Sequence, residues 1–209
     1  MSKGCNKNLI SPLSCKDYTV SGDSFELVIN KEYEMLVTAP VPTDLEKYYK
    51  STAYISHTDS KKTFFDKGYQ IVKNYTLQQK LSLLNSFKTS AKSVLDVGAG
   101  TGDFLSVCKN NDWETFGVEP SLVARDVAKK KGIFLKAGLS EFKNQKFDVI
   151  SLWHVLEHVE HLKDTIKTLQ GLLKPGGRIV VAVPNYKSYD AQFYNCLLYT
   201  SPSPRDLKL

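Results

Sequence analysis

An acidic residue followed by alternating glycines, near the middle of the chain, has the residue types of a loop that binds a nucleotide-like ligand. An apolar run of strand length closes on Asp96, and the next residues place a glycine at every second position: Gly98, Gly100 and Gly102. Glycines there permit a tight turn from a strand into a helix and let a ligand approach the backbone closely. Their spacing differs from the Gly-x-Gly-x-x-Gly fingerprint of dinucleotide-binding loops, which disfavours the alternative of an NAD-dependent enzyme.

A second acidic residue lies at the distance expected for a ribose contact. Glu119 ends the apolar run 113–118 and follows Gly98 by 21 residues, the separation expected for an acid at the carboxyl end of the next strand. A carboxylate at that point can accept two strong hydrogen bonds from a ribose diol. Ser121 is typical of a helix N-cap and predicts a helix that reaches about Lys131.

Further apolar runs complete an alternation of buried strands with helical stripes. Residues 147–152 predict a strand that leads into residues 154–158, and residues 172–178 close a helix through a Pro-Gly-Gly turn before a β-branched run. The alternation predicts a doubly wound α/β fold with the glycine loop at the topological switch point of the sheet. Its five parallel strands are expected near residues 93–97, 114–118, 133–135, 147–152 and 178–183.

In their order and spacing, these motifs across residues 92–185 resemble those of the class I S-adenosylmethionine-dependent methyltransferases. The resemblance implies a Rossmann-like parallel sheet with S-adenosylmethionine as the cofactor. It also implies transfer of a methyl group to an oxygen, nitrogen or carbon atom of an acceptor that the sequence does not identify. A small molecule is favoured as the acceptor, and the basic, aromatic-rich residues 59–91 leave nucleic acid as an alternative.

The resemblance assigns roles to the residues of the first two motifs. The amino-acid end of the methyl donor would be held by Asp96, in part through water, and by the glycine loop. That loop comprises Gly98, Gly100 and Gly102. The ribose of the donor would be held by Glu119.

The resemblance also implies roles for residues outside these two motifs. Leu139 and Trp153 would flank the adenine and the methyl group of the donor. Relatives often carry an aspartate for the adenine after the third strand; this chain has none near Leu139, so the contact would use backbone or packing. His154 is the candidate base, because an imidazole titrates near neutrality. Tyr54 and His57 are candidates for a lid.

Residues 154–158 also fit the H-x-x-E-H signature of inverted metallopeptidases. On a helix, His154 and His158 would share a face with Glu157 beside them, which suits a zinc site. The peptidase signature belongs on a long helix, whereas here it follows a buried strand. A module that binds the donor without catalysing transfer is a further alternative.

The composition suits one α/β domain with an N-terminal extension. The 209 residues carry a formal net charge of +6, much of it from lysines in residues 59–92. These lysines, Lys73 and Lys80 among them, are predicted to lie on the solvated faces of amphipathic helices. The apolar stripe is expected at Leu77, Leu81 and Leu84. No apolar run reaches the roughly 18 residues of a membrane span and no signal core is found, so the protein is expected to be cytoplasmic.

Residues 1–58 resemble the zinc-ribbon module that precedes the methyltransferase domain in some bacterial relatives. A ribbon needs two close pairs of ligands for tetrahedral zinc. Here Cys5 and Cys15 are far apart, and Asn30 and Tyr33 stand where the second pair is expected. The segment is therefore expected to keep its β-hairpins and to bind no metal, with its cysteines as reduced thiols.

The last residues do not resemble the rest of the domain. Residues 196–206 match the translation of a transposase-type sequencing adapter, so residues 196–209 are expected to be a non-native tail. The family's sheet has two further strands after the fifth, which this chain would lack. The predicted organisation is an extension at 1–58, basic amphipathic helices at 59–91, a truncated methyltransferase domain at 92–195 and a tail at 196–209.

Overall fold

The computed structural model describes residues 9–16, 22–39, 64–89, 91–159 and 161–189. The chain divides into two compact units, one formed by residues 58–184 and the other by residues 1–57 with 185–209. The predictions for Cys5, the lid residues Tyr54 and His57, and the tail 196–209 lie outside the described residues. The domain boundaries inferred from the sequence stay predictions.

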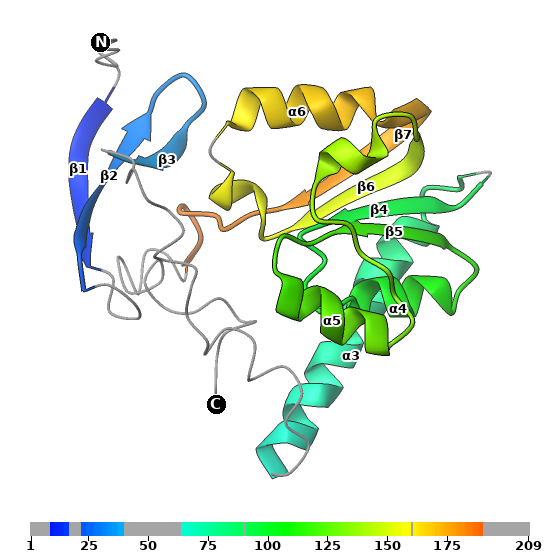
Figure 1. Ribbon diagram of the computed structural model, residues 1–209. Helices are drawn as coiled ribbons and strands as arrows, with labels where there is room; N and C mark the ends of the chain where they lie inside the picture. Colours follow the sequence, from blue (N-terminus) through cyan, green and yellow to red (C-terminus); the bar gives the residue numbers. More distant parts are fainter. Residues whose placement is uncertain (1–8, 17–21, 40–63, 90, 160, 190–209) are drawn as a thin grey trace. The chain divides into compact units, whose positions relative to one another are not determined.

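The larger unit is built on a parallel sheet with the strand order β5-β4-β6-β7 (Figure 1). The strands are β4 (Ser93–Val97), β5 (Glu114–Val118), β6 (Phe147–Trp153) and β7 (Leu173–Ala182). The predicted strands near 93–97, 114–118 and 147–152 are thus confirmed. Because the chain runs from β4 to β5 on one side and returns to β6 on the other, the carboxyl end of β4 lies at the switch point of the sheet, where such folds bind ligands.

The strand expected at residues 133–135 is wrong. Beyond β5 the described chain forms only an isolated parallel bridge between Val118 and Lys136. Lys136 donates its N–H to the carbonyl of Gly117, and Glu119 donates its N–H to the carbonyl of Lys136, both at 2.9 Å. Ile133 is buried in the core, whereas Phe134 next to it is 74% exposed. The chain still runs beside β5 at the position expected for a fifth strand, but only Lys136 pairs with it there.

Strand β7 begins five residues earlier than predicted, and the Pro-Gly-Gly segment lies inside it. The pairing of β6 with β7 shifts register between Phe147 and Val149, so residues 174–177 form an irregularity rather than a preceding turn. Close backbone packing explains one of the glycines: a Cβ at Gly177 would lie 2.9 Å from the carbonyl oxygen of Lys174.

Beneath this irregularity, Asp148 joins three strands at the amino-terminal end of the sheet. Its Oδ2 accepts hydrogen bonds from the Ser93 hydroxyl at 2.5 Å and from Lys174 Nζ at 2.8 Å. Burial of the Asp148 carboxyl opposes its ionisation, but the hydrogen bonds from Lys174 and Ser93 outweigh it and lower the pKa. The ionised carboxylate therefore stabilises the fold far from the glycine loop.

Helices cover both faces of the sheet (Figure 1). On one face lie α3 (Phe64–Asn85), α4 (Asp103–Lys109) and α5 (Leu122–Lys130), and on the other the 3-10 turn η1 (Leu139–Phe142) and α6 (Leu162–Gly171). The first face is packed around the predicted stripe of α3, which is buried as expected: Leu77, Leu81 and Leu84. The second is packed around Phe142, Ile150 and Leu169. The predicted N-cap is confirmed, because the Ser121 hydroxyl accepts the N–H of Ala124.

The smaller unit contains a three-stranded antiparallel sheet, which confirms the predicted hairpins. Its strands are β1 (Leu9–Lys16), β2 (Ser24–Asn30) and β3 (Met35–Thr38). The Asn30 side chain accepts the N–H groups of Glu32 and Tyr33 in the turn after β2, so it closes a hairpin where a ribbon would place a metal ligand. Within the described ranges, no helix is long and apolar enough to cross a lipid bilayer.

Candidate functional site

The glycine loop joins the end of β4 to the start of α4 and turns through left-handed backbone conformations. Gly98 has a φ of 70° and Gly100 a φ of 54°. A Cβ at Gly98 would clash with Cγ2 of Val155, so the loop packs directly on the segment after β6. A Cβ at Gly100 would meet no atom within 4 Å. The backbone at Gly100 is therefore open to a ligand, while Gly98 serves internal packing.

Glu119 connects the end of β5 to this loop. Its Oε2 accepts the N–H of Gly100 and its Oε1 accepts the N–H of Ser121, both at 2.9 Å. The first residues of the loop are also fixed to β5, because Gly98 and Ala99 donate their N–H groups to the carbonyl of Val118. A carboxylate has about four acceptor positions, so Glu119 can orient the loop and still accept hydrogen bonds from a diol.

Asp96 is a buried carboxyl group, 3% exposed, next to the glycine loop. The hydroxyl of Ser151 on β6 donates to its Oδ1 at 2.7 Å, which places the carboxyl on the face of the sheet covered by α3 and α4. The neighbouring Cys108 is a buried thiol whose pKa rises to about 12, first because of burial and then because of the Asp96 charge. Cys108 is therefore uncharged near neutral pH.

Trp153 ends β6 beside the first glycine of the loop. Val97 pairs with Leu152 in the parallel register of β4 and β6, so the next step brings Gly98 level with Trp153. The indole packs edge-on against the ring of Phe104 in α4, with the ring centroids 5.6 Å apart. The structure thus brings Asp96, the glycine loop, Glu119 and Trp153 together at the carboxyl ends of β4, β5 and β6.

His154 follows directly and has a left-handed backbone, with a φ of 56°. Its N–H donates to the carbonyl of Ala182 at 2.9 Å, and its Nδ1 lies 3.6 Å from Oε1 of Glu157. Such backbone conformations are costly for a residue with a Cβ and are concentrated at functional sites. The imidazole is 37% exposed, so its ring nitrogens can be reached from solvent.

Residues 154–158 do not form an α-helix. The 3-10 turn η2 spans only Leu156–His158, so the helical spacing that the peptidase alternative requires is absent. No group of three or more His, Cys, Asp or Glu side chains able to hold a metal ion is found among the residues that the structure describes. The absence of bound metal remains a prediction.

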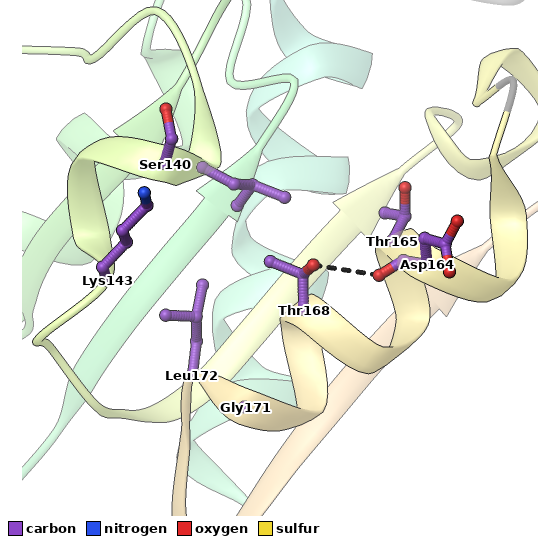
Figure 2. Close-up of a pocket in the computed structure, with 8 residues that line it drawn as sticks. Ser140, Lys143, Asp164, Thr165, Thr168, Gly171 and Leu172 are labelled. Carbon is purple, nitrogen blue, oxygen red and sulfur yellow. Dashed lines mark hydrogen bonds between the residues drawn. The ribbon is translucent and has the colours of Figure 1, made fainter.

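Leu139 packs on the opposite face of the sheet from Trp153. It contacts the hydrophobic cluster beneath α6 and borders a groove of about 500 Å³ between η1 and α6 (Figure 2). Hydroxyl groups and charged side chains line this groove, and Thr168 donates its hydroxyl to the backbone carbonyl of Asp164 at 2.9 Å. A role for Leu139 at the adenine would need the ligand to extend from the glycine loop across the strand ends.

Two lysines of α3 contradict the prediction that they lie on a solvated face. Lys73 Nζ lies 2.8 Å from Oδ2 of Asp103, and Lys80 Nζ lies 4.4 Å from the centroid of the Trp153 ring. Asp103, the first residue of α4, also accepts Lys131 Nζ at 2.8 Å. Burial opposes ionisation of the Asp103 carboxyl, but hydrogen bonds from Lys131 and Lys73 outweigh it and lower its pKa. The sequence interpretation missed these contacts because the partners are distant along the chain.

Comparison with known proteins identifies the family to which this sequence is similar. The family described as "Methyltransferase domain" matches residues 69–205, so its last ten positions fall in the segment predicted to be non-native, and that prediction stays open. An uncharacterised methyltransferase of Anoxybacillus flavithermus is 28% identical over 156 residues, which cover 68% of this chain and 66% of the relative.

Two solved structures share the fold. The S-adenosylmethionine-dependent methyltransferase from Archaeoglobus fulgidus aligns with a TM-score of 0.52 at 20% identity, over 66% of each chain. The plantazolicin methyltransferase BpumL, solved with a triazolic desmethyl-plantazolicin analogue and S-adenosylhomocysteine, aligns with a TM-score of 0.52 at 20% identity, over 78% of this chain and 60% of its own.

The chain spans 66% of the length of the Anoxybacillus relative and between 37% and 48% of the length of seven further curated relatives. The family match nevertheless covers more than half of this chain, and the order of its parallel strands is that of the doubly wound fold. The predicted fold class and family are both confirmed: the chain belongs to the methyltransferase-domain family and has the Rossmann-like fold of the class I S-adenosylmethionine-dependent methyltransferases.

Proposed function

We propose that this protein transfers a methyl group from S-adenosylmethionine to a small-molecule acceptor. The observation that carries the proposal is the open backbone at Gly100, whose N–H is held by the carboxylate of Glu119 at the carboxyl ends of β4 and β5. Nucleoside ligands bind at such a point because a glycine admits their close approach and an acid accepts their ribose hydroxyls.

The described residues fit this donor. Glu119 has acceptor capacity left for a ribose diol, and the space at Gly100 is free of protein atoms within 4 Å of an added Cβ. Asp96 offers a buried carboxylate to the ammonium of the amino-acid end, directly or through water. Leu139 and Trp153 are the proposed contacts of the adenine and the methyl group.

The donor, when bound, supplies a methyl group on a sulfonium, which already has a good leaving group. The protein's residues then position the acceptor, exclude water and accept a proton where the acceptor must lose one. His154 is the proposed base. Its Nδ1 lies 3.6 Å from Oε1 of Glu157, and the imidazole is 37% exposed.

The name of one similar structure supports the acceptor class: BpumL is named for plantazolicin and was solved with an analogue of it. The Anoxybacillus relative is named a methyltransferase, without an acceptor. Within the described ranges, no helix suited to a membrane is found. Nucleic acid is less well supported, because two of the lysines that suggested it, Lys73 and Lys80, contact residues of the domain itself.

A module that binds the donor without catalysis is the second candidate, because the chain spans only part of the length of its relatives. Both candidates require that the chain binds the methyl donor. Calorimetry of the purified chain with S-adenosylhomocysteine and with NAD tests this requirement. We expect binding of S-adenosylhomocysteine and none of NAD; the reverse would overturn the proposal. Transfer of label from methyl-labelled S-adenosylmethionine to small-molecule extracts then separates an enzyme from a binding module.

A further inference from the structure

Arg125 holds the backbone that carries the proposed ribose acid. Its Nη1 donates hydrogen bonds to the carbonyl oxygens of Glu119 and Pro120, both at 2.6 Å. Hydrogen bonds from an ionised donor are shorter and stronger than neutral ones. Arg125 is the fourth residue of α5, so its guanidinium ties this helix to the two residues that follow β5.

The bond to the Glu119 carbonyl replaces one that a longer neighbouring strand would supply. Lys136 donates its N–H to the carbonyl of Gly117 and accepts the N–H of Glu119. The evenly spaced bonds of a parallel ladder would next reach the carbonyl of Glu119, but the bridge between Val118 and Lys136 is isolated. A part-buried carbonyl needs a partner, and Arg125 provides it from the helix.

The helix by itself does not explain a cation at this position. The N-terminus of a helix carries a partial positive charge, which favours acidic residues near it and disfavours basic ones. Helix α5 has no acidic residue in its first turn and places Arg125 directly after that turn. Such departures from a local preference are expected where a residue serves a site.

The bonds from Arg125 leave the Glu119 carboxylate available. Both go to backbone oxygens, so they use none of the acceptor positions of the carboxylate. The carboxylate accepts the N–H groups of Gly100 and Ser121. Because these contacts require the backbone of Glu119 to lie where it does, a shift of that backbone would move the carboxylate away from both the loop and the proposed ribose position.

We infer that Arg125 is a positioning residue for the methyl donor: it fixes the backbone of Glu119 so that the carboxylate can meet Gly100 and the ribose diol together. The inference rests on the proposed function and names a residue outside the glycine loop on which donor affinity depends. Arg125 acts here through Glu119 and not by touching the donor. Substitutions of residues that act through one another are not additive, so the loss caused by an Arg125 variant should depend on the presence of Glu119.

A double-mutant cycle tests this dependence. Calorimetry gives the dissociation constant of S-adenosylhomocysteine for the unaltered chain, Arg125→Met, Glu119→Ala and the double variant. We expect Arg125→Met to weaken binding by about threefold to 30-fold when Glu119 is present, as for other pairs within one hydrogen-bond network, and by less than about twofold in the Glu119→Ala background. Arg125→Lys keeps a cationic donor and should restore part of the loss. Lys130→Met, at an exposed position of the same helix, is the matched control and should change no constant.

Amide exchange gives a second measurement that needs no ligand. The N–H groups of Gly100 and Ser121 both donate to the Glu119 carboxylate. Followed by nuclear magnetic resonance, these two amides should exchange faster in Arg125→Met than in the unaltered chain, while the amides of β4 should not change. Faster exchange along α5 with no change at Gly100 would show that Arg125 serves only the helix, and would overturn the inference.

Two outcomes of the calorimetry would also overturn it. Equal losses of affinity with and without Glu119 would show a direct contact with the ligand or a general change of structure, and unaltered constants in Arg125→Met would show no role in binding. If Arg125→Met does not fold by circular dichroism, Arg125→Gln takes its place. Failure of the unaltered chain to bind S-adenosylhomocysteine would instead overturn the proposed function, and the exchange of the Gly100 amide would still decide whether Arg125 positions Glu119.

Discussion

Replacement of Glu119 by alanine tests the centre of the proposed site. The Glu119 carboxylate accepts the N–H groups of Gly100 and Ser121, each at 2.9 Å. The same group is proposed to accept hydrogen bonds from the ribose diol. Glu119→Ala therefore removes a contact to the ligand and also releases the amide at the open point of the loop.

The expected loss of affinity follows from the strength of a hydrogen bond to a carboxylate. A hydrogen bond to a charged group contributes about 1.5–3 kcal/mol, so the loss of the ribose contact should raise the dissociation constant by about 10-fold to 150-fold. Glu119→Gln keeps an acceptor oxygen without the charge and should lose less. The freed N–H groups lie in a partly buried region that water can reach, so the far-ultraviolet circular dichroism should not change.

Calorimetry with S-adenosylhomocysteine and with 5′-methylthioadenosine checks this result. Both ligands contain the ribose, so Glu119→Ala should weaken them by the same factor, and Glu114→Ala, at the exposed start of β5, should weaken neither. Unaltered dissociation constants would remove Glu119 from the ribose site. A loss limited to S-adenosylhomocysteine would assign Glu119 to the amino-acid end instead.

Three further predictions concern the loop, the amino-terminal end of the sheet and metal. Gly100→Ala should abolish donor binding in calorimetry while lowering the free energy of unfolding by only about 1–2 kcal/mol, the cost of a Cβ in a left-handed conformation that meets no neighbour; a large loss of stability would contradict this. Because the pKa of Asp148 is lowered in the folded state, its stabilisation is present above the unfolded pKa of about 4 and is lost as the pH falls through the folded value. Urea denaturation should therefore show a smaller loss of stability below about pH 4 in Asp148→Asn than in the unaltered chain, and parallel pH profiles would refute this role. Metal analysis should find no stoichiometric zinc, and one equivalent lost in His158→Ala would revive the peptidase alternative.

The sequence was sufficient for the parts of the fold that local patterns determine. Strands β4, β5 and β6 are rich in apolar residues and have strand length, and the cap at Ser121 depends on residues within one helical turn. Residues 133–135 are apolar as well, but the segment is too short to form a ladder of backbone hydrogen bonds with β5. Local pattern alone cannot separate such a run from a strand, because pairing is decided by neighbours distant in the chain.

In the candidate site, too, some residues could be recognised from the sequence and others only from the structure. The glycine loop and Glu119 could be recognised because their chemistry requires particular residue types at a particular spacing. Lys73 and Lys80 were assigned to a solvated face because charge predicts exposure until a partner is known. Their partners, Asp103 and Trp153, come from other elements, so the contacts follow only from the tertiary structure.

The single bridge between Val118 and Lys136 has a consequence for the order in which the domain opens. Strand β5 is paired along its length with β4 on one side, whereas on the other side residues 133–136 form just two backbone hydrogen bonds to it, those of the bridge. Local unfolding begins where few bonds must break. The amide of Lys136 should therefore exchange with solvent deuterium far sooner than the amides of β4 and β6. The proposed donor site would then be rigid at Asp96 and more easily opened toward Leu139, and a ligand that contacts both residues would order the second as it binds.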